Sequence, residues 1–153
     1  MKKKFLIFAF IIFGFSAFGN QTFAQKQIEP PVVRDPLLEA DATHNLEVAN
    51  QYFKTKKAYK AVLMRFEETF AAYPEFSKMD EFLYLAGMSS FYLAKNKGKQ
   101  KIDAKNEEEA KKFAPEKMRE ESTAYLSQLI ENYPQSRFKG DAEKTLQSLK
   151  AKK

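Results

Sequence analysis

The chain contains two Tyr-Pro steps, Tyr73-Pro74 and Tyr133-Pro134, and each of them follows a segment with the apolar spacing of a helix. A proline cannot continue a helix, and the residue before a proline is driven out of the α region, so both steps end helices. Apolar residues that recur every three or four positions predict five helices, over residues 36–54, 58–73, 78–95, 115–133 and 136–150.

Local signals predict where these helices begin. Asp35 precedes Pro36, which combines a capping carboxylate with a proline at the first helical position. Ser77 and Ser136 follow the two Tyr-Pro steps, and we expect their hydroxyls to cap the third and fifth helices. Gly87 lies inside the third helix at a cost of about 1 kcal/mol, which indicates a close approach by a neighbouring helix.

The two Tyr-Pro steps belong to an internal repeat. Residues 66–85 lie over residues 126–145 at an offset of 60, with the same order of helix, Tyr-Pro, short turn and helix. This order is typical of tetratricopeptide-like hairpin arrays, whose usual period is about 34 residues. The sequence therefore predicts an all-α fold of about two helical hairpins and a C-terminal capping helix, over residues 36–150. Residues on the inner faces, including Leu38, Phe66 and Phe70, are expected to be buried.

Residues 96–112 differ from the rest of the domain, because they are highly charged and contain few apolar side chains. We interpret them as an insertion in the second hairpin and as its most mobile internal segment. Two glutamates at 107–108 precede two lysines at 111–112 by four residues, which favours a short, solvent-exposed helix.

The first 24 residues have the pattern of a secretory signal peptide. Three lysines at positions 2–4 are followed by an apolar stretch over residues 5–18, and small residues allow cleavage after Gly19 or Ala24. The alternative is an uncleaved membrane anchor, but the apolar stretch is shorter than the roughly 20 residues that a span needs. Residues 25–35 are then an extended linker.

Composition excludes several functions. The chain has no cysteine and one histidine, His44, so it lacks the residues for an ordinary zinc site or a thiol nucleophile. Without the three lysines of the signal peptide the formal net charge falls from +6 to +3, too little to indicate binding of nucleic acid. We expect no metal, no cofactor and no enzymatic activity. Because lipidation of a bacterial lipoprotein needs a cysteine, we expect an exported protein without a lipid anchor.

From about residue 36 to the C-terminus, the chain resembles the tetratricopeptide-like lipoproteins of the BamD type. The resemblance is carried by EFLYLAGMSSFYLA (81–94), by the charged insertion, and by AYLSQLIENYPQSRFKGDAEKTLQSLK (124–150). This family belongs to the machinery that assembles outer-membrane β-barrels. The chain departs from the family pattern in having fewer hairpins and no lipidated cysteine, so it is a short form.

The resemblance implies a protein-interaction module of the periplasm or the outer-membrane periphery, with a barrel precursor or a barrel-assembly subunit as its partner. We expect Asn50, Tyr84 and Met88 to face the concave side of the array, where an amide, an aromatic ring and a flexible apolar side chain can contact a partner. The alternative is that Tyr84 and Met88 only pack between repeats.

A second function remains open from the sequence. Lysines alternate with other residues at the start of the insertion, at positions 95, 97, 99 and 101. Such a run can attract anionic lipid headgroups, so the alternative is a structural protein that associates with the cell wall or an anionic membrane surface. The sequence does not indicate the oligomeric state.

Overall fold

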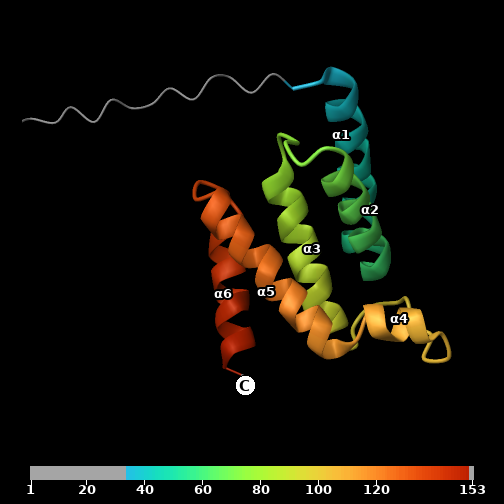
Figure 1. Ribbon diagram of the computed structural model, residues 1–153. Coiled ribbons are helices and arrows are strands. Elements are labelled where there is room, and N and C mark those ends of the chain that lie inside the picture. The colour runs from blue at the N-terminus through green and yellow to red at the C-terminus, as the bar shows by residue number, and fades with distance from the viewer. Residues whose placement is uncertain (1–33, 152–153) are drawn as a thin grey trace, which may run out of the picture. The chain divides into compact units, whose positions relative to one another are not determined.

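The structure of the protein is a computed structural model that describes residues 34–151 (Figure 1). The described residues form helices and no strands, which confirms the predicted all-α, tetratricopeptide-like fold. The signal peptide predicted for residues 1–24, and all but the last two residues of the predicted linker, lie outside the described part. The helices are α1 (Pro36–Gln51), a π-helical turn η1 (Tyr52–Lys56), α2 (Tyr59–Ala72), α3 (Met79–Leu93), α4 (Glu107–Lys112), α5 (Pro115–Asn132) and α6 (Lys139–Lys150).

The first hairpin is formed by α1 and α2. Asp35 caps α1 as predicted, because its Oδ1 accepts hydrogen bonds from the backbone nitrogens of Leu37 and Leu38 at 2.8 and 3.3 Å. The predicted helix over 36–54 changes its last turn to a π-helix, which ends at Lys57 in the left-handed region with a φ of 51°. This turn reverses the chain so that α2 packs back against α1.

The central helix is α3, which packs against both α2 and α5 (Figure 1). Gly87 permits a close approach of α5, since a Cβ there would lie only 2.6 Å from Cδ2 of Leu126. The hydroxyl of Ser122 donates to the backbone oxygen of Gly87 at 2.8 Å. The predicted close approach at Gly87 is therefore confirmed, and it joins the two hairpins.

The two Tyr-Pro steps have the same backbone geometry, as the repeat predicts. The backbone nitrogen of residue 76 donates to the oxygen of Tyr73 at 3.3 Å, and the nitrogen of residue 136 donates to the oxygen of Tyr133 at 2.9 Å. In both copies the next bond runs three residues further on, from 79 to 76 and from 139 to 136. As a result, α3 begins at Met79, two residues after Ser77, and α6 begins at Lys139, three residues after Ser136.

Neither serine is therefore the N-cap residue that the sequence predicted, although the hydroxyl of Ser136 accepts from the backbone nitrogen of Phe138, just before α6, at 3.2 Å. Both hydroxyls contact a carboxylate on an earlier helix: Ser77 donates to Glu39 on α1, and Ser136 donates to Asp80 on α3 at 2.6 Å. These serines join successive hairpins, because each turn lies beside the start of the preceding hairpin.

Two residues that were expected to be buried are partly exposed. Leu38 retains 39% of its accessible surface and Phe70 retains 38%, whereas Phe66 retains 2%. The helical stripe extends further around α1 and α2 than the neighbouring helices cover. Phe70 still stacks on Phe66, with ring centroids 5.4 Å apart.

The insertion over residues 96–112 contains the predicted short helix, α4, and contacts between side chains tie it to α2. Glu109 forms an ion pair with Lys60, and Lys112 forms one with Glu67 at 2.7 Å. The greater mobility of the insertion stays a prediction. Among residues 34–151, no helix is long and apolar enough to cross a membrane.

Candidate functional site

The three predicted partner-binding residues lie where α1, α3 and α6 come together. Asn50 on α1 donates from Nδ2 to Oε1 of Glu81 on α3 at 2.9 Å, and also to the backbone oxygen of Leu46 at 3.3 Å. The other carboxylate oxygen of Glu81 accepts from Nη2 of Arg137, just before α6, at 3.0 Å. Glu81 thus links the first helices of successive hairpins.

Tyr84 and Met88 occupy the next two turns of α3 on the same side. Tyr84 is half-buried and stacks on Phe138, with ring centroids 4.7 Å apart and an angle of 17° between the planes. Burial is the main cause that raises the pKa of the Tyr84 phenol, and Asp141 adds to it. Met88 is buried, and its sulfur lies 3.5 Å from the hydroxyl oxygen of Thr145 on α6.

The structure therefore places Asn50, Tyr84 and Met88 in contacts between α1, α3 and the start or the body of α6, and their part in partner binding stays a prediction. It also gives each of them a partner within the fold. The sequence did not indicate Phe138 or Thr145 as these partners, because the angle at which α6 packs against α3 depends on the whole array.

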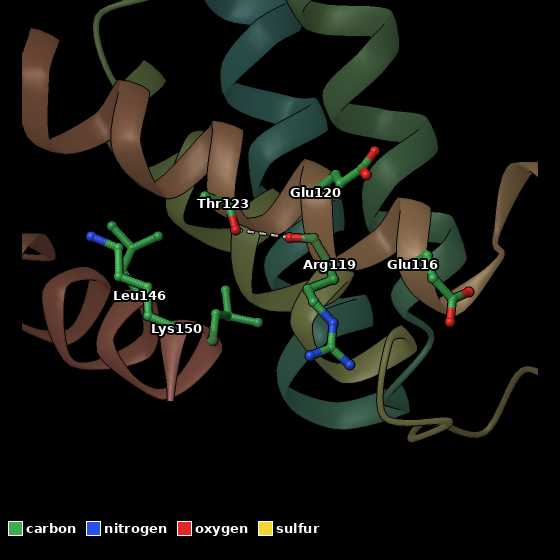
Figure 2. A pocket seen from close by; sticks show the side chains of 7 residues that line it. Glu116, Arg119, Glu120, Thr123, Leu146 and Lys150 are labelled. Atoms are coloured by element: carbon green, nitrogen blue, oxygen red, sulfur yellow. Dashed lines mark hydrogen bonds between the residues drawn. The ribbon is translucent and has the colours of Figure 1, made fainter. Parts of the chain in front are cut away.

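A second candidate site is the groove between α5 and α6, which has a volume of about 500 Å³ (Figure 2). Its apolar part is formed by Leu146 and Leu149 on α6, which are partly exposed and buried respectively. The polar residues of its lining come from both helices and are Glu116, Arg119, Glu120, Thr123 and Lys150.

The chemistry of this groove suits contact with a segment that is partly apolar and partly charged. Two carboxylates and two cationic side chains border the leucines, so the groove combines an apolar floor with a rim of mixed charge. The hydroxyl of Thr123 donates to the backbone oxygen of Arg119 at 2.9 Å (Figure 2).

The sequence indicated part of this groove. Leu146 and Leu149 belong to the apolar stripe of the last helix, which the sequence predicts to be buried as a whole. In the structure Leu149 is 8% exposed, whereas Leu146 is only partly buried because it lines the open groove between α5 and α6. An apolar residue left uncovered in this way was not recognisable from spacing alone.

A model of a protein family described as outer membrane lipoprotein (YfiO) matches residues 39–152. The chain belongs to this outer membrane lipoprotein family. The match confirms the family resemblance found in the sequence, and it supports a location in the cell envelope. Comparisons with curated proteins and with solved structures find no match.

Both candidate sites lie inside the part of the chain that matches the outer membrane lipoprotein family. The site around Asn50, Tyr84 and Met88 lies where α1, α3 and α6 meet, and the groove lies between α5 and α6. His44 is exposed on α1, away from both sites. Among residues 34–151, no group of three or more acidic, histidine or cysteine side chains is placed to hold a metal ion.

Proposed function

We propose that the protein is an adaptor of the cell envelope that binds a segment of another protein, in outer-membrane protein assembly or in envelope maintenance. The observation that carries this proposal is the match of residues 39–152 to the outer membrane lipoprotein family. An array of helical hairpins supports it, since such arrays present extended, rigid surfaces to other chains. The partner proposed is an outer-membrane barrel precursor or a barrel-assembly subunit.

The α5–α6 groove is the accessible place at which such a segment can dock. Its partly exposed Leu146 offers an apolar contact, while Arg119 and Glu120 on the rim can pair with either sign of charge. An amphipathic helix or an extended segment with alternating apolar and polar residues has the matching pattern.

Asn50, Tyr84 and Met88 remain part of the proposal as residues on which partner binding depends. Each substitution to alanine should weaken capture of the partner by about 1 kcal/mol or more while leaving the helical circular dichroism signal unchanged. Since all three have partners within the fold, unfolding must be measured on the same variants. Loss of the fold would indicate that these residues only pack between repeats.

The proposal can be tested by placing a photo-crosslinking amino acid at Leu146 and adding an unfolded outer-membrane β-barrel protein. A matched control carries the same amino acid at Glu143, which is exposed on α6 and does not line the groove. We expect crosslinks to the barrel protein from position 146 and few from position 143. Equal crosslinking at both positions, or none at either, would contradict docking in the groove.

The family is one of outer membrane lipoproteins, and lipidation of a bacterial lipoprotein needs a cysteine. We propose export without a lipid anchor, to the periplasm or the outer-membrane periphery, because the sequence contains no cysteine.

A further inference from the structure

Two lysine-rich segments that lie far apart in the sequence are joined at one end of the domain. The first covers residues 54–57, at the turn between α1 and α2, and the second covers residues 97–101, at the start of the insertion. The backbone nitrogen of Lys99 donates to the backbone oxygen of Lys57 at 2.9 Å. In the next residue, the side-chain oxygen of Gln100 accepts from the backbone nitrogen of Ala61 at 3.2 Å.

A glycine makes this junction possible. Gly98 has a φ of 119°, and a Cβ there would lie 2.8 Å from Cδ2 of Tyr59 and 3.1 Å from the backbone oxygen of Lys57. The contacts that hold the two segments together are made by backbone atoms, by Gln100 and by the ring of Tyr59. None of these contacts uses a lysine side chain of the two segments, and these side chains are exposed; Nζ of Lys56 lies 4.9 Å from the centroid of the Tyr52 ring.

Together, segments 54–57 and 97–101 form what we call the basic surface. It carries six exposed lysines, at positions 54, 56, 57, 97, 99 and 101. Neither residues 54–66 nor residues 91–102 contain an aspartate or a glutamate. The acidic residues nearest to the two segments along the chain are Glu47 and Glu67 for the first and Asp103 for the second, followed by three glutamates at 107–109. Asp103 accepts from the backbone nitrogen of Lys105, and Glu109 pairs with Lys60.

Helix ends account for only part of this charge. Lysines in the last turn of a helix interact favourably with its carbonyl groups, which explains Lys54 and Lys56 at the end of η1. Lys97 lies at the end of α3, where its backbone nitrogen donates to the oxygen of Tyr92 at 2.9 Å. Lys99 and Lys101 lie further on, in a segment outside any helix. Their concentration next to the first lysine segment therefore points to an external partner with negative charge.

The form of the basic surface indicates which kind of anion it binds. The charges are lysines, which act as hydrated point charges, rather than arginines, which recognise individual phosphates through two parallel hydrogen bonds. They are spread over exposed segments instead of surrounding a pocket. Such an arrangement suits diffuse attraction to an extended anionic surface, and the family of this chain is one of outer membrane lipoproteins. We propose that the basic surface docks the domain on an anionic phospholipid bilayer.

The experiment is vesicle flotation of the processed protein, with vesicles of phosphatidylglycerol and phosphatidylcholine in a 30:70 ratio and vesicles of pure phosphatidylcholine as the neutral control. Lys54→Gln/Lys57→Gln removes two charges from the first segment, and Lys97→Gln/Lys99→Gln removes two from the second. A matched control, Lys78→Gln/Lys144→Gln, removes two exposed lysines elsewhere. All variants share the same N-terminal segment, so its own affinity for the vesicles is common to them.

Each lysine near an anionic surface should strengthen the affinity about fivefold. We therefore expect the affinity for the anionic vesicles to fall about 10- to 25-fold in each basic-surface variant, which lacks two lysines, and to change little in the control. Lys97→Arg/Lys99→Arg, which retains the charge, should bind as the wild type does, and higher salt should weaken wild-type binding. This arginine variant and the salt series test the proposal even if a glutamine variant fails to fold.

Three results would overturn the proposal. They are equal binding by the basic-surface variants and the control, equal binding to neutral and anionic vesicles, and an effect of only one lysine segment. Competition by a soluble polyanion such as duplex DNA at concentrations below the anionic lipid would also overturn the choice of a membrane. No protein partner is present in the assay, so its outcome is independent of docking in the α5–α6 groove.

Discussion

Substitution of Gly87 by alanine tests the packing of α3 against α5, which joins the two hairpins. The added Cβ would lie 2.6 Å from both Cγ and Cδ2 of Leu126 and 3.5 Å from its backbone nitrogen. Leu126 is completely buried, so its side chain cannot move out into solvent. Real Cβ atoms do not approach other atoms this closely, and either the leucine or the helices must shift.

The size of the effect follows from two opposing terms. Overpacking a filled core costs about 1–3 kcal/mol, whereas alanine is favoured over glycine inside a helix by about 1 kcal/mol. We expect Gly87→Ala to lower the free energy of unfolding by about 1 kcal/mol, which lowers the melting temperature by about 3–5 °C in a domain of this size. Urea unfolding followed by circular dichroism at 222 nm measures the free energy of unfolding, and thermal unfolding followed by the same signal measures the melting temperature.

Gly140 provides the matched control, because it is also helical but nothing lies within 4 Å of its Cβ position. Gly140→Ala should raise stability by up to about 1 kcal/mol through helix propensity alone. The two Gly→Ala substitutions should therefore have opposite signs, although they make the same chemical change.

A double-mutant cycle isolates the contact with Leu126. Leu126→Ala alone should cost about 2–5 kcal/mol, because it leaves a cavity in the core. In that background the clash is absent, so Gly87→Ala should become neutral or stabilising. The reasoning would be refuted if Gly87→Ala stabilised the wild-type protein, or if it destabilised both backgrounds equally.

Three further predictions concern pH, proteolysis and export. Burial raises the pKa of Tyr125 to about 12, so between pH 10 and 12 the folded chain keeps a proton that the unfolded chain has lost, and stability falls as the pH rises. Tyr125→Phe should reduce the fall of the urea midpoint over this pH range. An unchanged fall would show that Tyr125 is not the group responsible. Trypsin should cut first at the lysines of 96–112, and faster after Lys60→Met, which removes the ion pair with α4; first cleavage within 58–73 would argue against the hairpin assignment. The intact mass of the exported protein should lack residues 5–18 and carry no acyl chain, and a mass that includes either would disprove the proposed processing.

The sequence by itself determined the order and the ends of the main helices. The Tyr-Pro steps end α2 and α5, and Asp35 with Pro36 begins α1, through steric and hydrogen-bonding effects that act within a few residues. The spacing of apolar residues likewise placed Gly87 at a helix contact, because an interior glycine has a local cost that packing must offset. These features are local, so they did not require knowledge of the assembled fold.

Tertiary structure alone decided which groups meet. Ser77 and Ser136 were expected to cap helices, and they donate to carboxylates on α1 and α3, because the turns place their hydroxyls beside the preceding hairpin. Leu38 and Phe70 fit an apolar stripe and still remain partly exposed, since coverage depends on which helix packs there.

The candidate sites depend on tertiary structure in the same way. The repeat register predicts that Asn50, Tyr84 and Met88 face the concave side of the array, and this stays a prediction. The contacts of these residues with α3 and α6 join segments that are distant in the sequence. The same is true of the junction between Lys57 and Lys99. Such contacts are set by the angles at which helices pack and by how the chain leaves each helix, and neither is encoded in the periodicity of a single segment.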